Sequence, residues 1–206
     1  MTNPRPNARV LCLLACGALA AAATGCARGG RPPEPVAQTA ALTRPAGDTE
    51  LLGPTWVPAA AASCRPPVGW NGSDADKQPG SEHKIWISPS GATAYGAIVV
   101  RHWLMPLASD ERVLGEFLKN MKASDGRADL LDKQHDPKLG GVGGIRFKVA
   151  GGKYTLRANL MSGGQRAWIV YAGTINAMPV DERELRAAEA ARDLTVIEPA
   201  GAGPGK

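Results

Sequence analysis

The side chains most able to do chemistry in this 206-residue chain are its three histidines and four cysteines. Such residues hold metals, or act as bases and nucleophiles, when their spacing brings them together. His83, His102 and His135 do not stand at helical ligand spacing with one another or with a cysteine. We expect His83 and His135 at the surface and His102 at a sheet edge. No Gly-x-Ser-x-Gly sequence marks a nucleophilic serine. The sequence therefore predicts no metal, no cofactor and no enzyme.

A glycine-rich run and an isolated cysteine are the remaining candidates for a chemical site. Gly140–Gly144 spells GGVGG but precedes a predicted strand, whereas a phosphate-binding loop opens a helix and carries Lys-Ser or Lys-Thr. Cys64 lies just before Pro66 and Pro67, at the edge of the predicted domain. We expect structural roles for both, which leaves a hydrolase with a dispersed site as the least favoured hypothesis.

The first 25 residues have the organisation of a secretory signal peptide. Arg5 and Arg9 precede the apolar or small residues 10–23, a run too short for the roughly 20 helical residues of a comfortable bilayer span. The sequence ATGC that ends at Cys26 then resembles the box of bacterial lipoproteins, in which the cysteine is acylated and the chain is cleaved before it. The resemblance implies a signal peptide at 1–25 and a lipid anchor at Cys26. It also implies a place in the bacterial cell envelope, on the extracytoplasmic side of a membrane.

Other interpretations of this N-terminus stay open. A rival box, LLAC, ends at Cys16 and fits the pattern more closely, but it leaves only residues 10–15 as the apolar run. An ordinary secretory signal and an uncleaved anchor are two more. Cleavage before Cys26 would lower the formal charge from +5 to +3 and leave Cys64 as the one unacylated thiol. A lone cysteine in an oxidising compartment is buried, free or paired between molecules, and we expect a monomeric domain if Cys64 packs under the sheet.

Residues 26–62 have the composition of a disordered tether. They are rich in proline, alanine and threonine and lack apolar periodicity, so they cannot build a core, and proline extends such a chain. Leu51-Leu52 and Trp56-Val57 are exceptions that could pack on the domain edge. Residues 199–206, rich in glycine and proline, predict a disordered tail. One domain over residues 63–198 remains.

Apolar alternation and helical spacing predict that this domain is α+β, with helices on an antiparallel sheet. Ser109 is a candidate N-cap for a helix that Gly126 would end. The other predicted elements are strands at 84–88, 94–103, 145–149, 154–161 and 167–171, a loop at 124–142 with a short strand at 129–133, a helix at 180–194 and an extended end at 196–197.

Two diglycine turns set the predicted register of the last three long strands. Gly151-Gly152 makes a two-residue hairpin turn that places Arg146 opposite Arg157, and Gly163-Gly164 makes the second turn. Apolar alternation agrees with both turns. Like charges directly opposite each other destabilise a sheet by up to about 1 kcal/mol. We therefore expect a negatively charged group near the two arginines that compensates their repulsion.

Two hypotheses explain how this basic face is offset. Between Asp136 and Asp181 the chain has no acid but many basic residues, which are Lys138, Arg146, Lys148, Lys153, Arg157 and Arg166. Either an acid of the last helix (Asp181, Glu182 or Glu189) pairs with the arginines, helped by stacking on Trp168, or an anionic partner does, such as a phospholipid head group or an acidic protein surface. The candidate binding residues are Arg146, Lys148, Arg157 and Trp168.

The order of these elements resembles the PsbP-like family. The resemblance rests on a Pro-x-Gly-Trp start at 67–70, a strand, a long helix, a glycine-preceded strand at 143–147, an aromatic strand at 168–171 and a C-terminal helix. The family includes the photosystem II extrinsic subunit P, the Ran-binding MOG proteins and many bacterial lipoproteins. It implies an antiparallel sheet between helices over residues 64–198, and members that mostly bind or stabilise other proteins.

Taken together, the patterns predict a membrane-anchored lipoprotein that presents a non-enzymatic binding domain to a protein of the cell envelope. The alternative is a carrier of a lipid or small amphiphile, held between sheet and helix. A formal charge of +5 is too modest to indicate a nucleic-acid partner.

Overall fold

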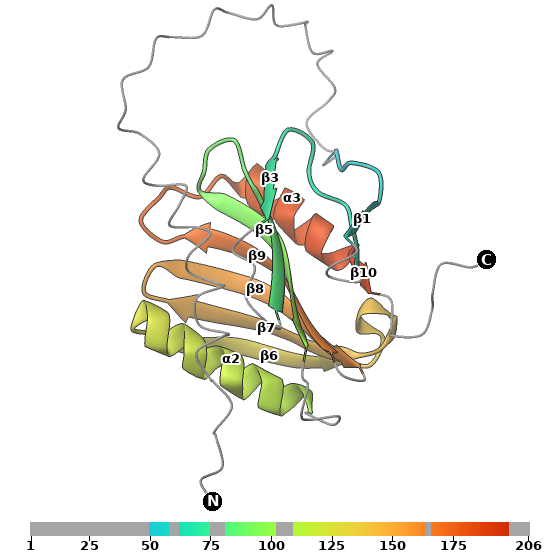
Figure 1. The fold of residues 1–206 in the computed structure, drawn as a ribbon. Helices are drawn as coiled ribbons and strands as arrows, with labels where there is room; N and C mark the ends of the chain where they lie inside the picture. Colours follow the sequence, from blue (N-terminus) through green and yellow to red (C-terminus); the bar gives the residue numbers. More distant parts are fainter. Residues whose placement is uncertain (1–49, 58–61, 75–80, 102–108, 164–165, 198–206) are drawn as a thin grey trace, which may run out of the picture.

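The centre of the computed structural model is a seven-stranded antiparallel sheet (Figure 1). The structure describes residues 50–57, 62–74, 81–101, 109–163 and 166–197. Across the sheet the strands are β3 (Asn71–Asp74), β4 (Ser81–Ile87), β5 (Thr93–Arg101), β9 (Arg166–Ile175), β8 (Tyr154–Gly163), β7 (Gly144–Gly151) and β6 (Ala128–Asp136). None of the described helices is both long and apolar enough to cross a membrane.

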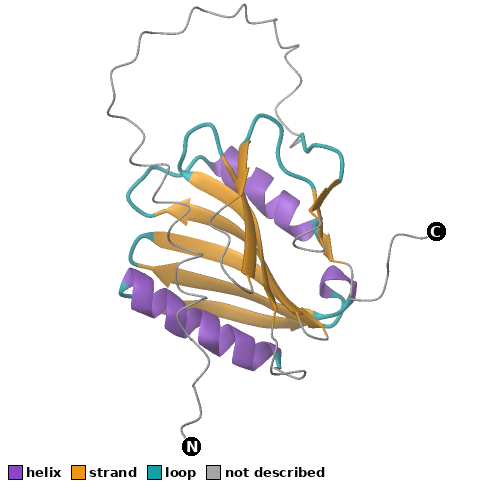
Figure 2. Cartoon of the chain, in the orientation of Figure 1, coloured by secondary structure: helices purple, strands orange, loops and turns teal. Residues whose placement is uncertain are grey.

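One helix lies on each face of this sheet (Figure 2). α2 (Asp110–Asp125) packs on β6, β7 and β8, and α3 (Glu182–Asp193) packs on the opposite face, against β5, β8 and β9. The side chains between these layers form two apolar cores, one containing Phe117 of α2 and the other Ala188 of α3. The predicted class, an antiparallel sheet flanked by helices, is confirmed.

The ends of α2 follow the sequence prediction. Ser109 accepts a hydrogen bond from the backbone N–H of Arg112 (3.4 Å), which satisfies one of the free donors of the first turn. Gly126 ends the helix with φ +76°, a left-handed conformation that costs glycine little. The apolar face of the helix is buried in the first core, through Val113, Leu114, Phe117 and Met121.

A second, three-stranded sheet joins the two ends of the described chain. It consists of β1 (Thr55–Val57), β2 (Ala62–Cys64) and β10 (Val196–Ile197), with β2 in the middle. Backbone hydrogen bonds also tie residues 50–52 to residues 66–68. Residues 50–57 therefore belong to the fold, which extends it past the predicted boundary at residue 63, while residues 58–61 and the part of the tether before residue 50 lie outside the described residues.

The hairpin between β7 and β8 turns one residue later than predicted. Gly151 still belongs to β7, so the turn residues are Gly152 and Lys153. Neither glycine has a positive φ. They provide space instead, because a Cβ on Gly151 would overlap Asp125 Oδ2 at the end of α2. The same carboxylate accepts a hydrogen bond from the backbone N–H of Lys153 (3.1 Å). The close approach of α2 thus fixes the register.

This shift changes the charged pairs on the sheet. The expected opposition of Arg146 and Arg157 is wrong, because Arg146 lies opposite Asn159 and Arg157 lies opposite Lys148. The hairpin between β8 and β9 shows the same one-residue shift. Two like charges therefore still face each other across β7 and β8, but they are Lys148 and Arg157.

The edge strand β6 is longer than predicted. The sequence predicts a loop with a short strand at 129–133, whereas β6 covers nine residues, Ala128–Asp136. Most of its side chains are exposed, and a bulge at Leu131 interrupts its pairing with β7. A strand is recognised in a sequence by the alternation of apolar and polar residues. β6 lacks this alternation because both of its faces are exposed and because the bulge shifts its register.

Candidate functional site

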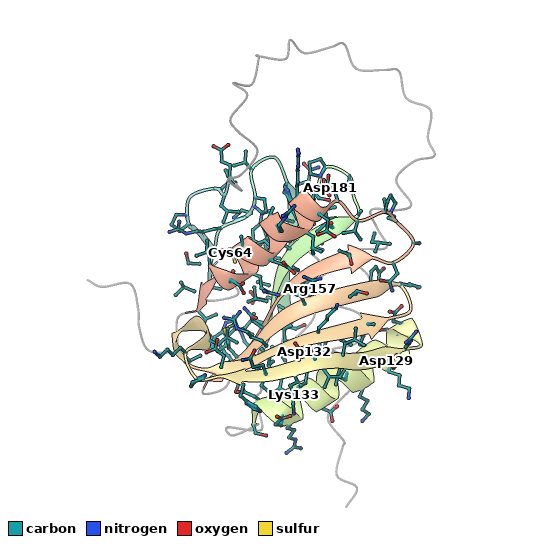
Figure 3. All side chains as sticks on the ribbon, turned by 180° about the vertical axis from the view of Figure 1, so that it is seen from behind. Cys64, Asp129, Asp132, Lys133, Arg157 and Asp181 are labelled. Atoms are coloured by element: carbon teal, nitrogen blue, oxygen red, sulfur yellow. The ribbon has the colours of Figure 1, made fainter. Side chains whose placement is uncertain are left out.

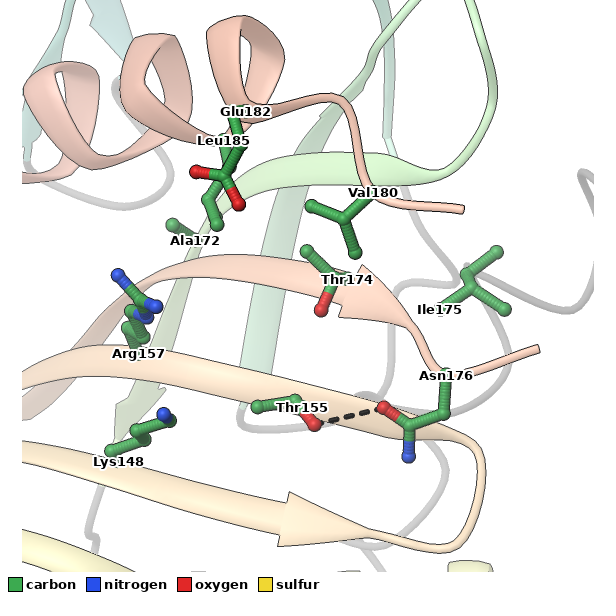
Figure 4. Close-up of a pocket in the computed structure, with 10 residues that line it drawn as sticks. All are labelled: Lys148, Thr155, Arg157, Ala172, Thr174, Ile175, Asn176, Val180, Glu182 and Leu185. Carbon is green, nitrogen blue, oxygen red and sulfur yellow. Dashed lines mark hydrogen bonds between the residues drawn. The ribbon is translucent and has the colours of Figure 1, made fainter. Parts of the chain in front are cut away.

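A pocket of about 310 Å³ lies between the start of α3 and the sheet (Figure 4). Lys148 of β7 and Thr155 and Arg157 of β8 form one side, and Glu182 and Leu185 of α3 form the other. Figure 4 shows the cationic groups on the sheet side and the carboxylate on the helix side. The pocket thus has a cationic end and an anionic rim.

The cationic end is formed by the like-charged pair on β7 and β8. One guanidinium nitrogen of Arg157, Nη1, donates to Glu189 of α3. Lys148, in contrast, has no carboxylate oxygen within 4.0 Å of its ammonium among the described residues. Its register partner on β6 is Asp132, which does not reach it. Within the described ranges, Lys148 is therefore the cation of this pocket that has no ion pair.

One end of the pocket is held by a side chain that sequence reasoning missed. Asn176, just after β9, accepts a hydrogen bond from the Thr155 hydroxyl (2.8 Å) and donates to the carbonyl oxygens of Gly151 (3.1 Å) and Gly152 (3.3 Å). It links three strands at the point where the first hairpin turns. No pattern in the sequence marks such a contact, because it depends on the register of two hairpins.

Arg146, a predicted binding residue, takes part in a structural ion-pair network away from this pocket. It donates to Asp136 Oδ2 (3.0 Å) and to Asp193 Oδ1 at the end of α3 (2.9 Å). The backbone N–H of Lys138 and the Arg146 guanidinium together lower the pKa of Asp136. Glu189 of the last helix thus pairs with Arg157, as one of the two hypotheses predicts. Arg146 pairs instead with Asp136 and Asp193, which that hypothesis does not name.

The other two predicted residues lie elsewhere. Trp168 is buried in the core under α3, with 1% of its surface exposed, so its indole contributes to packing. Cys26 lies outside the described residues. Figure 3 shows Arg157 on the strip of sheet between α3 and the edge strand that carries Asp132. Of the predicted set, the structure brings Lys148 and Arg157 together.

The histidines differ from the prediction in one case. His83 is buried, and its Nε2 lies 2.7 Å from the hydroxyl of Tyr171, so the expected surface position is wrong. His135 is exposed, as expected, and contacts Glu111 (2.9 Å). His102 lies outside the described residues. Within the part of the chain that the structure describes, no three His, Cys, Asp or Glu side chains gather in a metal-binding group.

Cys64 is fully buried under α3, which decides among the three states that the sequence leaves open. Burial raises the pKa of its thiol, and hydrogen bonds from Tyr95 and Thr195 oppose that rise. The Tyr95 hydroxyl also lies 2.6 Å from the Thr195 hydroxyl. Because the thiolate is the reactive form, this environment makes Cys64 a packing residue.

A solved structure with a TM-score above 0.5 has a similar architecture. The sheet between α2 and α3 defines a PsbP-like fold. The chain is similar to the solution structure of cyanobacterial PsbP (CyanoP) from Synechocystis, with a TM-score of 0.53, 13% identity, and coverage of 77% of this chain and 98% of that one. A crystal structure from Bacteroides thetaiotaomicron matches with a TM-score of 0.33 and 13% identity, over 70% of this chain and 48% of that one. No family model and no curated protein matches.

Proposed function

We propose that this protein is a lipid-anchored accessory protein of the bacterial cell envelope, whose domain binds and supports another envelope protein without catalysing a reaction. The observation that carries this proposal is the combination of a lipoprotein box at Cys26 with a PsbP-like domain. Residues 27–49 would serve as the tether, and two or three acyl chains would hold the protein firmly, since each buried CH₂ contributes about 0.8 kcal/mol.

The carrier hypothesis has weaker support. Ligand pockets that bury most of a drug-sized molecule have volumes of roughly 300–1,000 Å³, and the pocket beside α3, at about 310 Å³, is at the small end of that range. It has room for a head group but not for a head group and a long acyl chain together. This pocket therefore does not favour transport of a whole lipid.

Replacing the anchoring cysteine tests the proposal. Cells that express the full chain or its Cys26→Ser variant are fed labelled palmitate and then treated with a protein cross-linker. We expect label, signal cleavage and a discrete cross-linked complex for the natural sequence, and loss of all three for Cys26→Ser. Cys16→Ser, in the rival box, is the control and should behave like the natural sequence. Label that persists in Cys26→Ser would move the anchor to Cys16 and contradict the proposal.

A further inference from the structure

We propose that the pocket beside α3 binds a phosphate or carboxylate group, with Lys148 and Arg157 as its direct contacts. The group would belong to a small soluble molecule or to the head group of a lipid. This inference goes beyond the accessory role and does not depend on lipidation of Cys26. It starts from the cross-strand pair of cations, which the fold brings together at one end of a cavity.

The cation pair is incompletely neutralised. Arg157 has five N–H donors, and its interaction with Glu189 uses Nη1 alone. Lys148 has three donors and no ion pair with a described carboxylate. Side chains directly opposite in an antiparallel pair have Cβ atoms about 5 Å apart, so one oxyanion can be reached by both. An anion bound there would remove the repulsion between them.

The cavity limits what can bind. Ala172 and Thr174 of β9 are buried and form its floor, and the α3 side supplies apolar contact through Leu185 and Val180. The free N–H groups at the start of α3 are not the binding element, because Asp181 accepts from the backbone N–H groups of Arg183 (2.7 Å) and Glu184 (3.4 Å). Selectivity for an anion must come from Lys148 and Arg157.

Glu182 determines where the anion sits. Its carboxylate is on the exposed rim, at the opposite side from Lys148, so it repels an anion that enters from the helix side. An oxyanion is therefore expected at the sheet side of the pocket. This arrangement gives opposite signs for two substitutions: neutralising Lys148 weakens anion binding, and neutralising Glu182 strengthens it.

The test titrates glycerol 3-phosphate and acetate into the chain from residue 26 onward carrying Cys26→Ser, so that no lipid is attached. Binding is followed by nuclear magnetic resonance of the Arg157 side-chain N–H and of the Thr155 and Thr174 amides. We expect saturable shifts with a Kd of about 1 mM for at least one of the two anions. Lys148→Ala should weaken binding about tenfold, and Glu182→Gln should tighten it about twofold.

Lys119→Ala is the matched control. It removes the same charge from an exposed position on α2, on the other side of the sheet, and should leave the Kd unchanged. Vesicles of phosphatidylglycerol, with phosphatidylcholine vesicles as reference, identify the source of the group. If the protein binds the phosphatidylglycerol head group more tightly than it binds glycerol 3-phosphate, and this binding depends on Lys148, the group belongs to a lipid. Absence of saturation with every probe, or equal weakening by Lys148→Ala and Lys119→Ala, would overturn the proposal.

Discussion

Two glycines of the sheet are covered by aromatic rings from the neighbouring strand. Gly96 of β5 lies opposite Tyr171 of β9, and a Cβ on Gly96 would be 2.5 Å from Tyr171 Cζ. Gly72 has the same relation to Trp86, at 2.7 Å from its indole nitrogen. In both places the absence of a side chain lets an aromatic ring approach the backbone closely. At Gly96 this also positions the Tyr171 hydroxyl toward His83.

Substitution of Gly96 should therefore lower the free energy of unfolding. Gly96→Ala forces the buried Tyr171 ring to move, and overpacking of this kind costs about 1–3 kcal/mol of unfolding free energy, measured by urea denaturation. Gly115→Ala is the control, since Gly115 is exposed in α2 and nothing lies within 4 Å of its Cβ position. It should stabilise the protein by roughly 0.5–1 kcal/mol. Equal effects of the two substitutions would show that Tyr171 does not need this space.

α3 is held to the sheet at its C-terminal end by one carboxylate. Asp193 accepts hydrogen bonds from Arg146 (2.9 Å), Arg192 (3.0 Å) and Asn159 (3.3 Å). A negative charge at this end of a helix is unfavourable by itself, so the two arginines are needed to stabilise it. Burial raises the pKa of Asp193, but the contacts with Arg192, Asn159 and Arg146 outweigh burial and leave that pKa below its usual value.

The lowered pKa of Asp193 makes α3 sensitive to acid. Because the folded pKa lies below the unfolded value of about 3.9, its stabilising effect is complete above that value and is lost as the pH falls through the folded pKa. Asp193→Asn should cost about 1 kcal/mol at pH 7, discounted for partial exposure, and much less near pH 2. Urea unfolding at both pH values measures this. Asp132→Asn, on the exposed edge strand, should show no such difference, and an equal loss for Asp193→Asn at both pH values would contradict the assignment.

The elements that sequence predicts best are those with regular apolar alternation. Ile145, Phe147 and Val149 alternate with charged residues, and all three are buried in β7. The register was missed because Gly151 serves the approach of Asp125 rather than the turn, and nothing local encodes that contact. His83 was misplaced for a similar reason, since its polar neighbours suggest a surface whereas Tyr171, distant in sequence, covers it.

The candidate site was predicted only in part. Lys148 and Arg157 belong to the basic segment that sequence reasoning selected, and Glu189 was one of the acids expected to compensate it. Trp168, the predicted stacking partner of the arginines, is buried instead, because α3 covers that part of the sheet. Asn176 was invisible in sequence because its role depends on two carbonyl groups of a distant turn.

At the scale of the whole molecule, the small sheet extends the domain beyond the segment with clear sequence patterns. β2 pairs with β1 on one side and β10 on the other, so residues 55–57 and 196–197 stabilise each other through it. Ala62, Cys64 and Ile197 are all buried in the core under α3. Removing β1 would expose one edge of β2 and weaken the cover over that core.

Truncation tests where the domain begins. A chain that starts at residue 50 should melt at the same temperature as one that starts at residue 26 with Cys26→Ser, because it keeps β1 and the bonds of residues 50–52. A chain that starts at residue 63 should melt about 5 °C lower or more, and Cys64 should become reactive toward a thiol reagent. Identical melting and a protected thiol in the shorter chain would return the boundary to residue 63.

The pairing of both chain ends with β2 also governs how the protein can be tagged. Thr55 and Val196 lie opposite neighbouring residues of the same strand, Cys64 and Ser63, so β1 and β10 run parallel to each other on the two sides of β2, and a label inserted in any of these strands would disturb the cover over the core. An insertion between Gly152 and Lys153 would interrupt the turn that Asp125 and Asn176 hold, which leaves the exposed face of α2 as the better place for a label meant to report distance from the bilayer.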